Sequence, residues 1–184
     1  MPRLHAYEVL PDEAGREAVL ADWQALRDAG LPSQLDHSGA TNTPHVTVLS
    51  AERLGRDEDA RALARLATAL PADVRTSGLA LLGGSRVTVV RLLDVEDVLT
   101  AGVLGLRAEV AQRQHLGWLP HVTLARRVPR TDVARVLEAL GHDDVALRLV
   151  ELRRWDPDAG TVTTISPRAG VVDTTPAEGG SDHD

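Results

Sequence analysis

Pro44-His45-Val46-Thr47 recurs in this chain as Pro120-His121-Val122-Thr123, and an aliphatic residue follows each copy. Both copies have the composition of a short strand that is entered from a loop through a proline. Because residues two apart in a strand share one face, the histidine and the threonine of each copy point the same way, and the valine points the other way. Two such strands related by an approximate two-fold axis would bring two imidazoles and two hydroxyls to one groove.

Around the two copies, hydrophobic periodicity and turn residues predict an alternation of strands and helices. Each motif strand precedes a predicted helix, so the copies occupy the same place in two similar half-domains. The order indicates an α+β domain over residues 1–168, and the small and acidic residues 169–184 are typical of a disordered tail. Strands are expected over residues 4–10, 45–50, 74–82, 86–93, 121–127, 145–155 and 161–166, and helices over 11–29, 57–70, 96–113 and 132–140.

Composition excludes several kinds of chemistry. The chain has no cysteine and its 20 basic residues are all arginine, so cysteine nucleophiles, thiolate metal sites and lysine Schiff bases are excluded. A net charge of −7 argues against a broad contact with duplex DNA, so a nucleic-acid partner is expected to be short or held by its end. The apolar runs are too short for a membrane span, and the N-terminus lacks the layout of a signal peptide. We therefore expect a cytoplasmic protein that does not enter a membrane.

The two histidines have the chemistry that phosphodiester cleavage needs at neutral pH. One neutral imidazole can take a proton from water or a ribose hydroxyl, while one imidazolium protonates the departing oxygen. The hydroxyls of Thr47 and Thr123 can donate hydrogen bonds to the non-bridging oxygens of the phosphate. This scheme requires neither a metal nor another cofactor, and we expect none. The sequence does not decide whether His45 or His121 is the base.

The paired His-x-Thr strands, with the second motif in the form Pro-His-Val-Thr-Leu-Ala-Arg, resemble the 2H phosphoesterase superfamily. The resemblance covers about residues 3–166 and is strongest to the bacterial 2'-5' RNA ligase-like branch, the RNA 2',3'-cyclic phosphodiesterases. It implies a bilobal α+β fold in which two antiparallel sheets, flanked by helices, border a central cleft. It also implies catalytic roles for His45, Thr47, His121 and Thr123. Members of that branch act on 2',3'-cyclic phosphate ends or 2'-5' linkages, and the reverse ligase reaction is included in this expectation.

Three further residues are candidates for substrate contacts. By strand alternation, Arg127 shares the face of His121 and Thr123, which makes it the candidate phosphate clamp. Tyr7 on the first strand and Trp118 before the second motif are candidates for stacking on a base. The expected partner is an RNA end or a small cyclic nucleotide, bound by a monomer because the cleft lies within one chain.

Alternative interpretations of the histidines remain open. They can be structural residues at strand starts, or the fold can serve as a non-catalytic module that binds RNA ends or nucleotides. A metal-dependent hydrolase is a third alternative. Its zinc ligands would be His37, His45, His115 and His121, although their spacings match no familiar zinc pattern.

Overall fold

The computed structural model describes residues 3–37, 39 and 41–166, so the predicted tail over residues 169–184 lies outside the described part of the chain. No helix within these ranges is both long enough and apolar enough to cross a membrane. The elements are β1 (His5–Pro11), α1 (Glu13–Asp28), η1 (Gln34–Asp36), β2 (Val46–Ala51), α2 (Arg56–Leu66), β3 (Ala72–Gly83), β4 (Arg86–Asp94), α3 (Asp97–Glu109), β5 (His121–Pro129), η2 (Arg130–Asp132), α4 (Val133–Leu140), β6 (Ala146–Asp156) and β7 (Thr161–Thr164).

The strands form one antiparallel sheet with the order β1-β2-β5-β4-β3-β6-β7. A further pairing between β1 and β6 closes six of these strands into a ring, and β7 pairs outside β6. The two motif strands, β2 and β5, are neighbours, but they pair at a single position, where Val46 lies opposite Val122. The repeated tetrapeptides therefore meet at the narrowest junction of the sheet.

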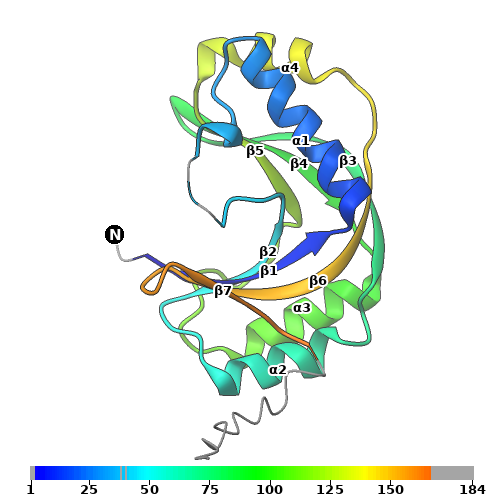
Figure 1. Ribbon diagram of the computed structural model, residues 1–184, viewed down its shortest axis with the longest axis vertical. Coiled ribbons are helices and arrows are strands. Elements are labelled where there is room, and N and C mark those ends of the chain that lie inside the picture. Colours follow the sequence, from blue (N-terminus) through cyan, green and yellow to red (C-terminus); the bar gives the residue numbers. More distant parts are fainter. Residues whose placement is uncertain (1–2, 38, 40, 167–184) are drawn as a thin grey trace, which may run out of the picture.

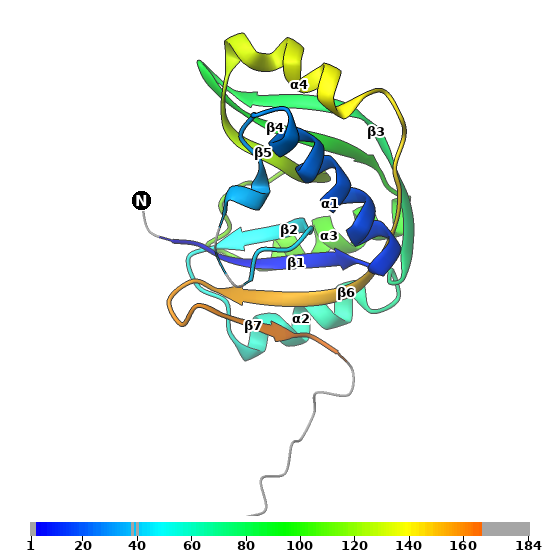
Figure 2. The same cartoon turned by 45° about the horizontal axis from the view of Figure 1, so that its top comes forward.

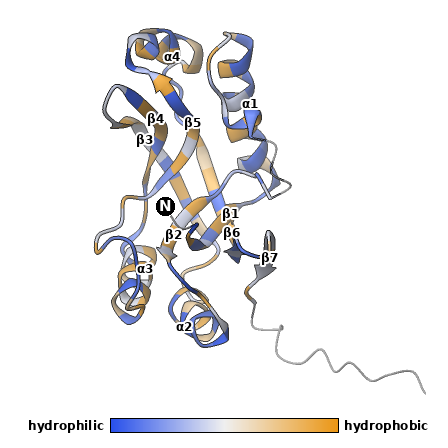
Figure 3. Cartoon of the chain, turned by 90° about the vertical axis from the view of Figure 1, so that its left-hand side faces the viewer, coloured by the Kyte–Doolittle hydropathy of each residue, from blue (hydrophilic) through white to orange (hydrophobic). Residues whose placement is uncertain are grey.

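Two lobes lie on either side of this junction (Figures 1 and 2). The first lobe is formed by β1, β2, β6 and β7 with α2 and α3, and the second by β3, β4 and β5 with α1 and α4. Figure 3 shows the two pairs of helices at opposite ends of the molecule. This arrangement confirms the predicted bilobal α+β fold. The two sheets implied by the resemblance are joined into one hydrogen-bonded ring.

The aliphatic residues of the motifs lie in the hydrophobic core, as strand alternation predicts. Val46, Val48, Val122 and Leu124 are all at most 1% exposed. Helix α3 lies against β2 and helix α1 lies against β5. The opposite face of both strands, which carries the histidines and threonines, is turned away from this core.

Two predicted helices are too long. The helix expected over 96–113 ends at Glu109, because the following residues pair with the edge of β2: Arg113 forms a bridge with Ala51, and the Gln114 amide donates to the Ser50 carbonyl at 2.8 Å. The helix expected over 57–70 ends at Leu66, and residues 67–69 form a turn in which the Ala69 amide donates to the Leu66 carbonyl at 3.1 Å. In the first case tertiary pairing overrides helix propensity.

Asp22 and Arg91 form a buried ion pair between α1 and β4. Two charge-assisted hydrogen bonds join them, at 2.6 Å and 2.8 Å, and both residues are at most 9% exposed. Replacing Asp22 with alanine leaves an uncompensated buried charge, so we expect a loss of about 3–5 kcal/mol in the free energy of unfolding. Urea denaturation measures this loss. The double variant Asp22→Leu/Arg91→Met should recover most of the lost stability. If it loses as much stability as Asp22→Ala, the buried charge is not the cause.

Candidate active site

The two motif histidines have the same local geometry. His45 Nδ1 lies 2.7 Å from the Thr43 carbonyl oxygen, and His121 Nδ1 lies 2.7 Å from the Leu119 carbonyl oxygen. A carbonyl oxygen accepts only, so in both rings Nδ1 carries the proton and donates it. In both motifs a proline separates the histidine from its acceptor, and the residue before a proline is restricted to extended backbone, which fixes this carbonyl. Each ring therefore keeps Nε2 for proton transfer.

The single pair between the motif strands arranges all four motif side chains. The structure pairs the strands at Val46–Val122 alone; an antiparallel register continued by one residue in each direction would place His45 opposite Thr123 and Thr47 opposite His121. Residues directly opposite each other in such a pair have Cβ atoms about 4.5–5.5 Å apart. The four side chains are half-buried, whereas the two valines between them are buried. The matching Nδ1 contacts of His45 and His121 agree with the two-fold relation expected from the repeat.

Two tryptophans support the junction in the same symmetric way. The indole N–H of Trp23, on α1, donates to the Thr123 carbonyl at 3.1 Å, and that of Trp118 donates to the Thr47 carbonyl at 2.9 Å. Each indole therefore adds a hydrogen bond next to the single pair that joins β2 and β5. Trp23 lies in the core at 2% exposure, and its contact with the motif has no signal in the sequence.

Two pockets open at the motif face. The His45 pocket, of about 710 Å³, is also lined by Glu8, Asn42 and Arg153. The His121 pocket, of about 620 Å³, is also lined by Thr47, Thr123, Trp118 and Arg107. Arg126 lines both pockets, so they meet at its side chain.

Residues 11–161 match the profile of the 2'-5' RNA ligase superfamily. The chain belongs to this superfamily, whose members are the 2H phosphoesterases. Two solved structures similar to it are TT0787 of Thermus thermophilus, 18% identical with a TM-score of 0.51, and LigT of E. coli complexed with NADP+, 16% identical with a TM-score of 0.50. The matches cover 89% of this chain and 96% and 94% of theirs, and at these identities they show a shared fold. No curated protein sequence matches the chain.

Along β5 of this chain, the strand alternation that predicted Arg127 as the phosphate clamp does not hold. Between Thr123 and Val128 the register of β5 against β4 shifts twice, and the φ of Arg127 is +59°. Each shift adds a residue to β5 and changes which face the next side chain takes. As a result Arg127 lines the His45 pocket alone, whereas its neighbour Arg126 lines both pockets.

Tyr7 does not reach the cleft, which corrects the prediction that it stacks on a base. Its side chain is fully buried in the core, and its hydroxyl donates to Asp59 at 2.8 Å. Burial, followed by this hydrogen bond, raises the pKa of Tyr7 well above its usual range. The odd residues of β1 face the core, so Tyr7 packs with Val9. Trp118 is half-buried and lines the His121 pocket, so stacking by Trp118 stays a prediction.

Glu8 is a site residue that the sequence did not single out. It is 6% exposed and lines the His45 pocket. Its Oε2 accepts from Arg153 Nε at 2.8 Å and lies 2.7 Å from Arg153 Nη2, while its Oε1 lies 3.5 Å from His45 Nε2. A signal was present: alternation puts Glu8 on the face opposite the core side chains of β1, and a carboxylate buried there requires a charged partner.

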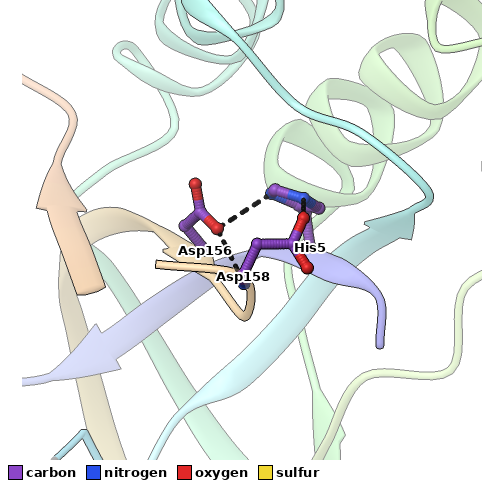
Figure 4. Close-up of side chains that lie close together, drawn as sticks. All are labelled: His5, Asp156 and Asp158. Carbon is purple, nitrogen blue, oxygen red and sulfur yellow. Dashed lines mark hydrogen bonds and ion pairs between the residues drawn. The ribbon is translucent and has the colours of Figure 1, made fainter. Parts of the chain in front are cut away.

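The zinc alternative is not supported by the positions of its four histidines. His37 and His45 line one pocket, and His115 and His121 line the other. Within the described ranges, a different group has three potential ligands close together: His5, Asp156 and Asp158 (Figure 4). None of these three lines either pocket.

The geometry of this second group is that of ion pairs. His5 Nδ1 lies 3.9 Å from Asp156 and His5 Nε2 lies 3.4 Å from Asp158, so each nitrogen faces a different carboxylate (Figure 4). One metal ion would bind only one of the two ring nitrogens. The arrangement is that of an imidazole ring between two carboxylates.

Asp156 should contribute to stability in a way that depends on pH. The amide of Ala159 first, then that of Asp158 and the charge of His5, lower the pKa of Asp156 below its usual range. This contribution is therefore present above the unfolded pKa of about 4 and is lost as the pH falls through the folded value. We expect Asp156→Asn to reduce the change in Tm between neutral pH and about pH 3. Asp158→Asn keeps both amide hydrogen bonds and should follow the wild type, so identical pH profiles for all three proteins would contradict the assignment.

Proposed function

We propose that this chain is a metal-independent phosphodiesterase that acts on 2',3'-cyclic phosphate ends or 2'-5' linkages of RNA or nucleotides. The observation that carries the proposal is the pair of motif histidines on neighbouring strands, each with its Nδ1 held by a backbone carbonyl, in two pockets that share Arg126 as a lining residue. The superfamily to which the chain belongs supports an RNA or nucleotide phosphoester as substrate. Ligation of a 2',3'-cyclic phosphate end to a 5'-hydroxyl is the reverse of cleaving a 2'-5' linkage into those two ends.

In this proposal the phosphate contacts Arg126 between the two pockets. In-line displacement at phosphorus needs the entering and leaving oxygens on opposite sides. His45 and His121 then take the roles of general acid and general base, one in each pocket. Thr47 and Thr123 donate to the non-bridging oxygens, where negative charge develops in the transition state.

The pockets suit a small ligand. Each has a volume in the range typical of small-molecule sites, about 300–1,000 Å³. Trp118 offers an aromatic face in the His121 pocket, and Arg127 offers a charge in the His45 pocket for a neighbouring phosphate. We therefore propose an RNA end or a cyclic nucleotide as the partner, bound by a cytoplasmic monomer.

The test is turnover of uridine 2',3'-cyclic phosphate and of a short RNA with a 2',3'-cyclic end, in the presence of EDTA. We expect hydrolysis of at least one substrate at an unchanged rate after chelation. Loss of activity in EDTA that zinc restores would establish a metal-dependent hydrolase instead. Tight binding of the short RNA without turnover would favour the non-catalytic binding module.

A further inference from the structure

The two histidines differ in what lies beside them, although their backbones are related by symmetry. His45 Nε2 is 3.5 Å from Glu8 Oε1, an ion-pair distance. Within the described residues, the ring of His121 has the Leu119 carbonyl as its partner and no carboxylate at such a distance. The site is therefore symmetric in its strands and asymmetric in its charge.

The sheet register shows where this asymmetry arises. Strand β1 pairs with β2 as β4 pairs with β5, and the residue opposite the motif threonine is Glu8 in β1 and Val90 in β4. The next strand places Arg153 opposite Glu8, and Ala80 opposite Val90. The ion pair beside His45 thus corresponds to an aliphatic pair in the other half of the molecule.

Arg153 fixes the orientation of the Glu8 carboxylate. It contacts Oε2 with two nitrogens, and its Nη2 also donates to the Thr41 carbonyl at 3.1 Å. Both side chains are 8% exposed, so neither swings freely into solvent. With Oε2 occupied by the guanidinium, Oε1 is the oxygen that faces His45.

The other charged groups that line the His45 pocket are less suited to orient the His45 ring. Asp36, His37, Arg126 and Arg127 line the same pocket, but all four are exposed, so solvent screens their charges. Glu8 is the buried carboxylate in direct reach of His45.

We propose that Glu8, oriented by Arg153, is a positioning residue that stabilises the protonated form of His45. This inference rests on the proposed function, and it makes His45 the general acid and His121 the general base. In hydrolysis of a cyclic phosphate, a water oxygen bonds to phosphorus and its proton passes to His121 Nε2. The bond from phosphorus to one ring oxygen breaks, and that oxygen takes the proton from His45 Nε2. The product is a phosphate monoester with one free ribose hydroxyl.

A double-mutant cycle tests whether Glu8 acts through His45. The rate of hydrolysis of uridine 2',3'-cyclic phosphate is measured for Glu8→Gln alone and in the His45→Ala and His121→Ala backgrounds. We expect Glu8→Gln to lower kcat about tenfold or more in the wild type and with His121→Ala, but less than about twofold with His45→Ala, because the residue it acts through is then missing. Equal losses in all three backgrounds would overturn the proposal.

A substrate whose leaving group needs no proton distinguishes the general acid from the general base. A 4-nitrophenolate departs without a proton, so thymidine 5'-(4-nitrophenyl phosphate) needs the base and not the acid. On this ester Glu8→Gln and His45→Ala should lose at least about tenfold less activity than they lose on the cyclic phosphate, whereas His121→Ala should lose at least about a hundredfold on both substrates. The ratio of the two activities in one preparation does not depend on the folded fraction. If Glu8→Gln loses the same fraction of activity on the cyclic phosphate and on the nitrophenyl ester, the role of Glu8 is structural and the inference is overturned.

Glu8→Gln leaves the Arg153 charge buried without its partner, so folding needs its own control. The double variant Glu8→Gln/Arg153→Met replaces the ion pair by neutral side chains, and it should show the same preference for the nitrophenyl ester. A double variant with the wild-type ratio of activities would overturn the proposal. A wild-type protein that hydrolyses none of these substrates would instead overturn the proposed function itself.

Discussion

Replacing either His45 or His121 with alanine is expected to lower kcat on a 2',3'-cyclic phosphate by at least about a hundredfold. The physical reason is that a positioned acid or base contributes about 10²–10⁴-fold to the rate. Each ring has its Nδ1 held by a backbone carbonyl, so each substitution removes one oriented Nε2. Both side chains lie on the half-buried face of the motif strands, so the core is left intact. Initial-rate kinetics with excess EDTA measure the effect.

Each pocket supplies its own matched control for this prediction. His37 lines the His45 pocket and His115 lines the His121 pocket, and both are exposed and outside the motifs. Alanine at either position should leave kcat within about threefold of the wild type, since neither is placed for proton transfer. If the control variants lose as much activity as the motif variants, or if the motif variants stay active, the two-histidine mechanism is wrong.

The sequence predicts the parts of the site that follow from strand periodicity. The alternation within each Pro-His-Val-Thr places the histidine and threonine on one face and the valine in the core, and the structure has this arrangement. The repeat also predicts that the two strands are related by symmetry. These features depend only on residues close together in the chain, where local geometry determines the outcome.

Other parts of the site depend on contacts that are distant in sequence. Arg153 reaches Glu8 across 145 residues, and Trp23 reaches the Thr123 carbonyl across 100 residues. Such contacts are fixed by sheet order, which periodicity does not give. The position of Arg126 depends on two register shifts in β5, and a shift of one residue changes the face of every side chain that follows. Strand alternation alone therefore predicts Arg127, and not Arg126, as the phosphate clamp.

Replacing Arg126 with methionine is expected to lower kcat on the same cyclic phosphate by about a hundredfold. Removal of one donor that stabilises transition-state charge costs about 10²–10³-fold in other enzymes. Arg126 lines both pockets, so its guanidinium is the charged group common to the two histidines. Methionine keeps the length and the apolar stem of the side chain while it removes the charge, and Arg126 is exposed, so folding should not change.

Arg127→Met is the matched control, because it removes the same charge from the adjacent position of β5. Arg127 lines the His45 pocket alone and does not border the His121 pocket, so we expect its loss to lower kcat by no more than roughly fivefold. The effect of this variant should appear in KM for the short RNA, whose second phosphate can reach that pocket, and not in kcat for the cyclic mononucleotide. A larger loss of kcat in Arg127→Met than in Arg126→Met would support Arg127 as the phosphate clamp, as strand alternation predicts. It would also mean that the two register shifts in β5 do not determine which arginine meets the phosphate.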